Sequence, residues 1–399
     1  MFRLSHFMQE LVTPTPVRNR KPPGPVVIWN LIRRCNLNCK HCYALAADVD
    51  FPGELSTGEV FTVMDDLRAF GVPVLILSGG EPLMRADIFD IAERAKAKGF
   101  YVGLSTNGAL IDDAMADRIA ATDFDYVGIS LDGIGAVHDA FRRQEGAYEA
   151  SLQGLRLCRA RGVRVGLRYT MTEQNIDSLV PLLDLTEAED VQKFYLSHLV
   201  YAGRGNRYRE DDARHRTTRD ALDQVFERCW DYARRGIVKE FVTGNNDADG
   251  PYFLRWVERR FPDKANHIRA MLEAWGGNAS GVNVANIDNL GNVHPDTFWS
   301  HYTLGNVKER PFSEIWADTS DPIMAGLKAK PRQIKGRCAP CRYFSICGGN
   351  TRVRAFQLTG DPWQEDPACY LSNAEIGAES DDDRVTLHPY RSRRHALSA

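Results

Sequence analysis

The sequence lacks long hydrophobic runs. Hydrophobic residues make up 43% of its 399 residues, yet no stretch of eighteen consecutive apolar residues occurs. Nothing in it therefore predicts a membrane-spanning helix. The N-terminal segment also lacks a continuous apolar core followed by a cleavage site with small residues, so we expect no secretory signal. These two absences together predict a cytoplasmic protein.

The chain also lacks a surplus of basic charge. Lysine and arginine number 50 against 53 aspartates and glutamates, which gives a net charge of -3 at pH 7. A general nucleic-acid-binding protein carries a strong basic excess, so that class is excluded. The charged fraction of 26% is that of an ordinary globular protein. The length suffices for one large domain and a smaller one.

Cysteine is scarce outside two short clusters. Cys158 and Cys229 fall in predicted helices, where we expect them to be core residues. The clustering of the others does not suit a disulfide framework and, in a reducing compartment, indicates metal binding. The first cluster consists of Cys35, Cys39 and Cys42, and the second of Cys338, Cys341, Cys347 and Cys369.

The first cluster has the spacing C-x3-C-x2-C. Three thiolates leave one iron of a [4Fe-4S] cube without a protein ligand. An open coordination position is the mark of a catalytic metal site, whereas structural sites are closed. The alternatives are a zinc knuckle, or a cluster whose fourth cysteine lies elsewhere. Zinc sites usually pair two C-x2-C units, and no second pair follows within a short finger, which favours an iron–sulfur loop.

Short apolar runs alternate with segments of helical periodicity along the first 235 residues. Strict alternation predicts an α/β fold with a parallel sheet. Four successive strands end in polar or glycine-rich turns at the same end, which favours a barrel with its site at that end over an open doubly wound sheet. Six strand–helix units are fewer than eight, so we expect a partial (β/α)6 TIM-like barrel. The predicted strands are 26–32, 72–77, 101–104, 126–129, 163–169 and 193–199.

The rest of the chain changes in character. The alternation of residues 282–287 and the turn at 288–291 predict a β-hairpin, in an α+β domain that holds the second cysteine cluster. The charged C-terminal stretch predicts disorder. We therefore divide the chain into an N-terminal arm (1–23), the barrel (24–236), a helical connector (237–275), the auxiliary domain (276–378) and a tail (379–399).

The strand ends carry polar residues that suit a ligand. Two adjacent glycines let a backbone approach a ligand closely, and a carboxylate beside them accepts bonds from an ammonium group. Small polar side chains can bind ribose or carboxylate, or simply cap the next helix. An arginine can pair with a ligand carboxylate or lie on the surface. The candidates are Gly79, Gly80, Glu81, Pro82, Thr106, Asn107, Ser130, Arg142 and Arg168.

His198 ends the sixth predicted strand, where we expect its side chain to point into the barrel mouth. It is a candidate for proton transfer, or for binding a metal of the substrate. The alternative is a buried structural histidine.

Two of these motifs resemble those of the radical S-adenosylmethionine (SAM) enzymes: the cysteine loop with Tyr43 after it, and Gly79-Gly80-Glu81-Pro82. The resemblance implies the same six-unit barrel, and a [4Fe-4S] cluster whose open iron takes the amino and carboxylate groups of SAM. It also implies an enzyme that forms a 5′-deoxyadenosyl radical, which removes a hydrogen atom from the substrate. The SAM contacts it implies are Tyr43, Gly79, Gly80, Glu81, Pro82, Thr106, Asn107, Ser130, Arg142 and Arg168.

The second cysteine cluster can close a site completely, and its spacing suits zinc or [4Fe-4S]. It resembles the C-terminal half of the SPASM and twitch extensions of the same family. Full SPASM domains carry further cysteines around a hairpin, where this chain has Asn278 and Asp296. The resemblance therefore implies one auxiliary [4Fe-4S] cluster, and two clusters in all.

Within the family the chain resembles members of haem d1 biosynthesis. That resemblance implies an iron tetrapyrrole substrate, 12,18-didecarboxysirohaem, which loses propionate side chains. It also implies a reductase with a flavodoxin- or ferredoxin-type electron donor, and neither a nucleic acid nor a membrane as partner. The stretches that carry it are 27–31, 168–172, 195–205 and 276–281.

Three alternatives remain open. The first is a radical SAM decarboxylase of other haem precursors in the sirohaem route. The second is a peptide-modifying maturase, although these often have an N-terminal recognition domain for which the short arm leaves no room. The third is a non-catalytic electron-transfer or zinc scaffold protein, which leaves the incomplete ligand set of the first cluster without a purpose.

Overall fold

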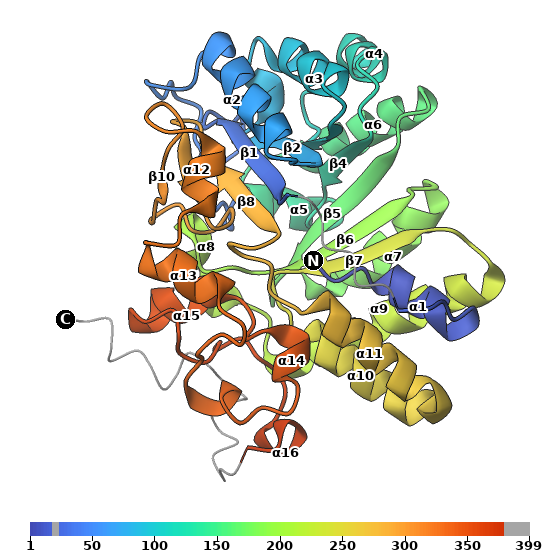
Figure 1. Cartoon of the computed structure of the whole chain (residues 1–399). Helices are drawn as coiled ribbons and strands as arrows, with labels where there is room; N and C mark the ends of the chain where they lie inside the picture. Colours follow the sequence, from blue (N-terminus) through green and yellow to red (C-terminus); the bar gives the residue numbers. More distant parts are fainter. Residues whose placement is uncertain (18–23, 379–399) are drawn as a thin grey trace.

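The computed structural model describes residues 1–17 and 24–378. Its centre is a ten-stranded sheet in the order β10-β9-β8-β1-β2-β3-β4-β5-β6-β7 (Figure 1). Neighbours from β1 to β7 pair in parallel, as strand–helix alternation predicts. The predicted α/β fold is confirmed. The strands are β1 (Val26–Ile32), β2 (Val74–Gly79), β3 (Tyr101–Thr106), β4 (Tyr126–Ser130), β5 (Val165–Met171), β6 (Lys193–His198) and β7 (Glu240–Gly244).

Helices between these strands cover the outer face of the curved sheet (Figure 1). In α2 the buried residues Val60, Val63, Met64 and Leu67 recur at helical spacing, which makes the apolar stripe that faces the strands. Ser56 and Glu59 form a capping box at its start. The covering helices are α2 (Thr57–Ala69), α3 (Ile88–Ala97), α4 (Asp113–Ala121), α6 (Ala147–Ala160), α7 (Leu179–Ala188) and α9 (His215–Arg235).

The predicted helical connector is wrong at its start. Residues Glu240–Gly244 form β7, which pairs with β6 and gives the barrel a seventh parallel strand. Five residues are too short for their periodicity to stand out from the helical pattern around them. The remainder of the segment is helical, as predicted, in α10 (Asp249–Arg260) and α11 (Ala265–Trp275).

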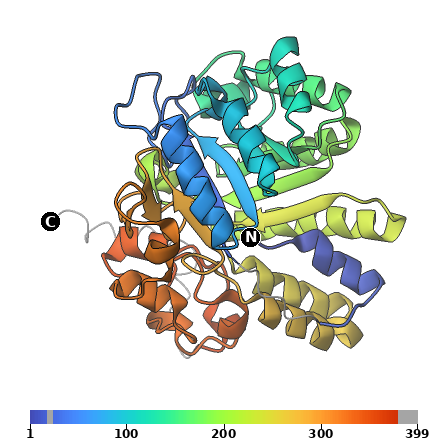
Figure 2. The ribbon, with the colours of Figure 1, turned by 45° about the horizontal axis from the view of Figure 1, so that its top comes forward.

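The N-terminal arm contains a helix that the sequence analysis does not predict, α1 (Leu4–Val12). Leu4, Phe7, Met8 and Leu11 are buried and share one face of it. Figure 2 shows α1 beside α10 and α11. Before it, Phe2 pairs with Thr243 of β7. The rest of the arm (18–23) and the predicted tail (379–399) lie outside the described residues.

The C-terminal region continues the sheet of the barrel. The predicted hairpin is confirmed, because β8 (Val284–Ile287) pairs antiparallel with β9 (Asn292–His294). Strand β8 also pairs in parallel with β1, and β10 (Gly305–Asn306) extends the hairpin. The short helices of this region are α12 (Phe312–Ala317), α13 (Pro322–Lys328), α14 (Phe344–Cys347), α15 (Arg352–Thr359) and α16 (Asn373–Ile376).

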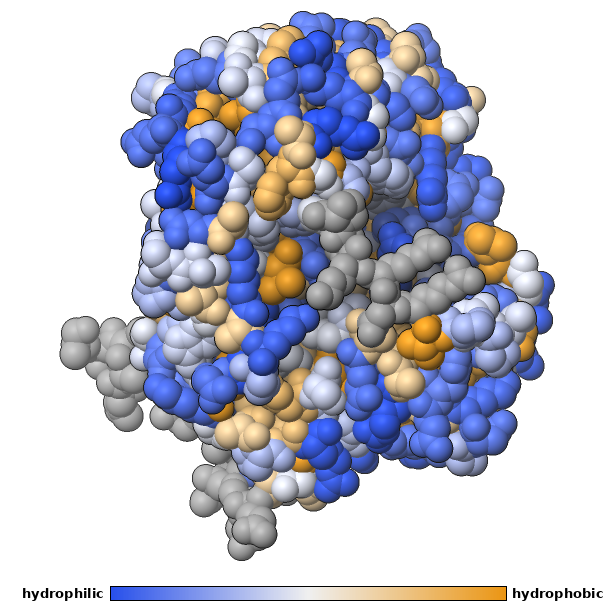
Figure 3. All heavy atoms as spheres, viewed as in Figure 1, coloured by the Kyte–Doolittle hydropathy of each residue, from blue (hydrophilic) through white to orange (hydrophobic). Residues whose placement is uncertain are grey.

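The face of the molecule in Figure 3 is largely hydrophilic, with apolar side chains in small scattered groups. Among the described helices, none combines the length and the apolar character needed to cross a membrane.

Candidate active site and cluster sites

The first three cysteines lie in one loop that follows β1 directly. The backbone N–H of Cys35 donates to the carbonyl of Ala47 at 3.1 Å and closes the loop. Cys35 and Cys39 are buried, and Cys42 is half-buried. Helix α8 (Gly203–Arg207) packs on the loop, and Arg204 donates from two N–H groups to carbonyls of the loop, one of them that of Cys39 at 2.7 Å. The fold thus holds the three cysteines together before any cofactor binds.

The sulfur atoms of this loop accept hydrogen bonds. The backbone N–H of Leu37 lies 3.4 Å from Cys35 Sγ, and Arg142 Nη1 lies 3.4 Å from Cys39 Sγ. Such bonds are a feature of iron–sulfur ligands, whose charge they stabilise. Burial raises the pKa of the Cys35 thiol to about 12. A bound cluster would therefore displace a proton from this cysteine. The donor set fits a [4Fe-4S] cluster with one open iron.

Gly79 and Gly80 bring the end of β2 against the start of this loop. A Cβ on Gly79 would lie 2.2 Å from the carbonyl oxygen of Ile32, and one on Gly80 would lie 2.2 Å from that of Arg34. The N–H of Gly80 donates to Ile32 at 2.6 Å. We expected these glycines to admit a ligand. In the structure, the backbone at the start of the cluster loop fills the space beside both glycines.

Replacing Gly80 by alanine is expected to displace the cluster loop, because the added methyl group would overlap two backbone carbonyls. We expect the variant to retain less iron than the wild type after anaerobic reconstitution, since the loop that would hold a [4Fe-4S] cluster is displaced. Gly58→Ala is the matched control, because a Cβ there meets no atom within 4 Å. It should keep the full iron content. Full iron content in Gly80→Ala would contradict the role given to this glycine.

Glu81 joins the ends of β2 and β3. Its side chain is fully buried, and its carboxylate accepts from Thr106 Oγ1 at 2.7 Å and from the backbone N–H of Asn107 at 2.8 Å. Burial raises the pKa of Glu81. Asn107 in turn donates from Nδ2 to Asn36 Oδ1 in the cluster loop at 2.8 Å. The structure therefore brings three predicted site residues together beside the cysteines, and Pro82 starts the short turn that follows.

Tyr43 and Arg168 face the interior of the barrel. The Tyr43 hydroxyl donates to Asn30 Oδ1 on β1 at 3.2 Å. Arg168 donates to Ser105 Oγ and lies 5.4 Å from the ring centre of Tyr195. It is paired across β4 and β5 with the predicted residue Ser130. Its partners Ser105 and Tyr195, a hydroxyl group and an aromatic ring, are neutral, which leaves the charge of Arg168 available to an anionic ligand.

Arg142 is not a surface residue. It ends α5 (Ala136–Arg142), it is buried, and it forms an ion pair with Asp132 while its Nη1 reaches Cys39. Asp132 is fully buried and also accepts from the N–H of Thr170 at 2.7 Å. Burial acts against the charged form, but the charge of Arg142, together with His41, His138 and the hydrogen bond from Thr170, more than offsets it and lowers the pKa of Asp132. Asp132 is not among the site residues predicted from the sequence, yet it anchors an arginine at the cluster loop.

The structure corrects the orientation expected for His198. Side chains alternate along a strand, and Tyr195 and Ser197 take the interior face of β6. His198 therefore faces outward, where its Nε2 lies 3.0 Å from Asp249 Oδ2. The other oxygen of Asp249 accepts from the Tyr370 hydroxyl at 2.8 Å. This buried network occupies the Nε2 atom of His198, which suits a structural histidine better than proton transfer to a substrate.

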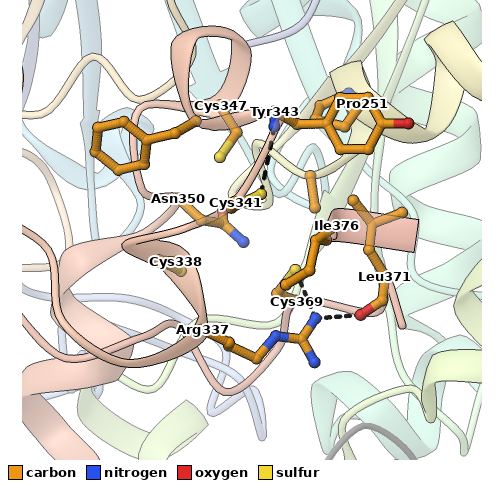
Figure 4. A pocket seen from close by; sticks show the side chains of 12 residues that line it. Pro251, Arg337, Cys338, Cys341, Tyr343, Cys347, Asn350, Cys369, Leu371 and Ile376 are labelled. Carbon is orange, nitrogen blue, oxygen red and sulfur yellow. Dashed lines mark hydrogen bonds between the residues drawn. The ribbon is translucent and has the colours of Figure 1, made fainter. Parts of the chain in front are cut away.

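The four C-terminal cysteines line one cavity, although Cys369 is far from the others in sequence (Figure 4). The cavity has ≈ 380 Å³ of atom-free space, part of it open to solvent. The backbone N–H of Tyr343 lies 3.4 Å from Cys341 Sγ. Burial raises the pKa of the Cys338 thiol to about 12. Arg337 also lines the cavity and has no place in the predicted site, although it directly precedes Cys338.

Among the described residues, no three cysteine, histidine or acidic side chains are placed to hold a single ion, either at this cavity or at the first cysteine loop. The placement of the sulfurs therefore does not separate zinc from [4Fe-4S] at this site. Four cysteines spread around a cavity suit a [4Fe-4S] cube, in which each thiolate binds a different iron.

Asn278 and Asp296 take part in a network of hydrogen bonds with Arg332 and Ser280. Arg332 donates from Nη1 to Asn278 Oδ1 at 2.9 Å and from Nη2 to the carbonyls of Asn278 and Ser280, both at 3.2 Å. The Ser280 hydroxyl donates to Asp296. Arg332 and Asp296 are both buried. Hydrogen bonds thus join the segments that carry Asn278 and Asp296, and one auxiliary cluster stays a prediction.

The comparisons with known proteins agree with this geometry. Residues 29–186 match the Radical SAM superfamily model. The chain is 58% identical to "Pre-heme d1 synthase" of Dinoroseobacter shibae, over 99% of this chain and 98% of that one. It is 45% identical to "Fe-coproporphyrin III synthase" of Methanosarcina barkeri, over 90% of each.

Among solved structures, Streptococcus suis SuiB bound to S-adenosylmethionine superposes with a TM-score of 0.70 at 17% identity, over 88% of this chain and 78% of that one. At this identity the likeness concerns the fold alone. The family match covers β1, the cysteine loop and the strands up to β5, and the relatives extend it over nearly the whole length. The chain belongs to the radical SAM superfamily.

Proposed function

We propose that the chain is an enzyme of haem d1 biosynthesis that removes propionate side chains from 12,18-didecarboxysirohaem. The observation that carries this proposal is the 58% identity to "Pre-heme d1 synthase" along almost the full length of both chains. The similarity extends over the C-terminal region as well as the barrel. This supports a common reaction more strongly than a shared barrel would.

Membership of the radical SAM superfamily implies S-adenosylmethionine and one [4Fe-4S] cluster as cofactors. Cys35, Cys39 and Cys42 would hold that cluster, which would supply the electron for the reductive cleavage of SAM. We assign the SAM carboxylate to Arg168, whose partners Ser105 and Tyr195 are neutral. Tyr43, Ser130 and the segment Gly79–Pro82 complete the contacts. Thr106 and Asn107 hold Glu81 in place.

We assign an auxiliary [4Fe-4S] cluster to Cys338, Cys341, Cys347 and Cys369, which surround one cavity (Figure 4). A reductase with a flavodoxin- or ferredoxin-type carrier would supply electrons. Loss of a propionate arm from a substrate radical leaves an electron to be accepted, and the auxiliary cluster is the acceptor that this chain itself offers.

The second candidate is a decarboxylase of another haem precursor. The 45% identity to "Fe-coproporphyrin III synthase" over 90% of each chain favours it over the peptide maturases. The two reactions differ in what leaves the macrocycle. A decarboxylase removes carbon dioxide and keeps the carbon arm, whereas the proposed reaction removes the whole propionate side chain.

The test is an anaerobic assay of the reconstituted protein with dithionite, SAM and 12,18-didecarboxysirohaem. We expect 5′-deoxyadenosine to form in step with a tetrapyrrole product that lacks propionate arms, as read by mass spectrometry. A product that has lost only carbon dioxide would favour the second candidate. Cleavage of SAM that leaves the tetrapyrrole unchanged would overturn the proposed substrate but keep the enzyme class.

A further inference from the structure

The wall of the auxiliary cavity is almost free of charge. Besides its four cysteines, the lining consists of apolar side chains, of Tyr343 and Asn350, and of one basic residue, Arg337. A [4Fe-4S] cluster with four thiolate ligands carries net negative charge. In an apolar wall a nearby charge acts strongly, because little solvent screens it. Arg337 is therefore the residue of the wall best placed to act on the charge of the cluster.

The side chain of Arg337 is aimed at a ligand sulfur. Its Nη2 lies 3.6 Å from Cys369 Sγ and also donates to the carbonyl of Leu371 (Figure 4). Its backbone N–H donates to Glu365 Oε2 at 2.8 Å, which fixes the start of the side chain. Its Nε–H is buried and has no partner among the described residues. A cluster in the cavity would give that donor an acceptor.

We propose that Arg337 is a tuning residue that raises the reduction potential of the auxiliary cluster. Reduction adds one negative charge to the cluster, and a cation that donates to a ligand sulfur stabilises the reduced form more than the oxidised one. A raised potential suits a cluster that accepts an electron after substrate chemistry. This functional consequence rests on the proposed function, whereas the effect of Arg337 on the potential does not.

The first cluster site differs in its electrostatics. There Arg142 also reaches a ligand sulfur, that of Cys39, but it is paired with the buried carboxylate of Asp132. The pair adds little net charge beside the cluster. We therefore expect the auxiliary cluster to be the more readily reduced of the two.

The test measures the midpoint potential of the auxiliary cluster by EPR-monitored reduction. The full-length chain carries alanine at Cys35, Cys39 and Cys42, so that one cluster remains. Replacing Arg337 by glutamine should lower the potential by at least 59 mV, a tenfold change in the equilibrium constant for one electron. Arg337→Lys keeps the positive charge but loses the planar guanidinium group with its several N–H donors, and should show a smaller shift in potential. No tetrapyrrole is needed, so failure of the proposed substrate leaves the test intact.

Arg234→Gln is the control, because Arg234 is an exposed arginine near the C-terminal end of α9 and does not line the cavity. Its potential should equal that of the parent chain. An unchanged potential in Arg337→Gln with full iron content would overturn the proposal. If Arg337→Gln assembles no cluster, Arg337→Met, a second neutral variant, decides: a lowered potential supports the proposal, and an unchanged one overturns it.

Discussion

Replacing Cys39 by alanine is expected to abolish SAM cleavage and to remove about four iron atoms per chain. Cys39 is buried at the centre of the loop, and both Arg142 and Arg204 are directed at it. Two remaining thiolates cannot hold a cube in the geometry that leaves one iron open for SAM. The measurements are 5′-deoxyadenosine formed under dithionite, by chromatography, and iron per chain after anaerobic reconstitution.

Cys158→Ala serves as the control. Cys158 is fully buried in α6 and belongs to the hydrophobic core, away from both cysteine clusters. Its replacement should lower stability by a modest amount and leave the iron content and SAM cleavage as in the wild type. SAM cleavage by Cys39→Ala at more than a few per cent of the wild-type rate would contradict the assignment of the loop.

The largest effect on stability is expected from Arg354. It is fully buried, it pairs with Asp366 at 2.9 Å, and it donates from Nη1 to the carbonyls of Leu199 and Asn245. Replacement by alanine leaves the Asp366 carboxylate buried without its counter-charge, which costs about 3–5 kcal/mol. The two carbonyls belong to the barrel and Asp366 to the C-terminal region. Urea denaturation followed by circular dichroism measures the loss.

An exposed pair gives the comparison. Arg310 and Asp318 lie 3.1 Å apart with side chains 40% and 31% exposed, and Arg310→Ala should cost no more than about 1 kcal/mol. Arg354→Met combined with Asp366→Leu should recover much of the stability, because no lone charge is then buried. Equal losses in Arg354→Ala and Arg310→Ala would contradict the large cost predicted for breaking the buried pair.

Local patterns were enough to predict most of the fold. The barrel strands and helices, the hairpin and the two cysteine clusters follow from periodicity and spacing, which act over a few residues. Strand β7 and helix α1 were missed because their signals are short, and their partners lie far away in the chain. Glu240–Gly244 forms a strand because its backbone pairs with β6. Leu4–Val12 forms a helix because β7 and α9 bury its apolar face.

The sequence predicted which residues belong to the site better than it predicted what those residues contact. Sequence identifies Gly79 and Gly80 as essential backbone positions, but only the fold shows that their neighbour is the cluster loop. The orientation of His198 depends on the register of β6, which a shift of one residue reverses. Arg337 escapes notice because its partner, Cys369, lies 32 residues away.

The pairing of β8 with β1 limits how this chain can be divided. A truncated gene product that ends after α9 would leave β1 as an unpaired edge, with a row of free N–H and C=O groups open to association with another chain. The exposed strand would be the one that leads into the cysteine loop. For the same reason, a chimaera that exchanges C-terminal regions between relatives must carry over a β8 that matches the recipient's β1. The shortest useful expression unit therefore extends past the hairpin.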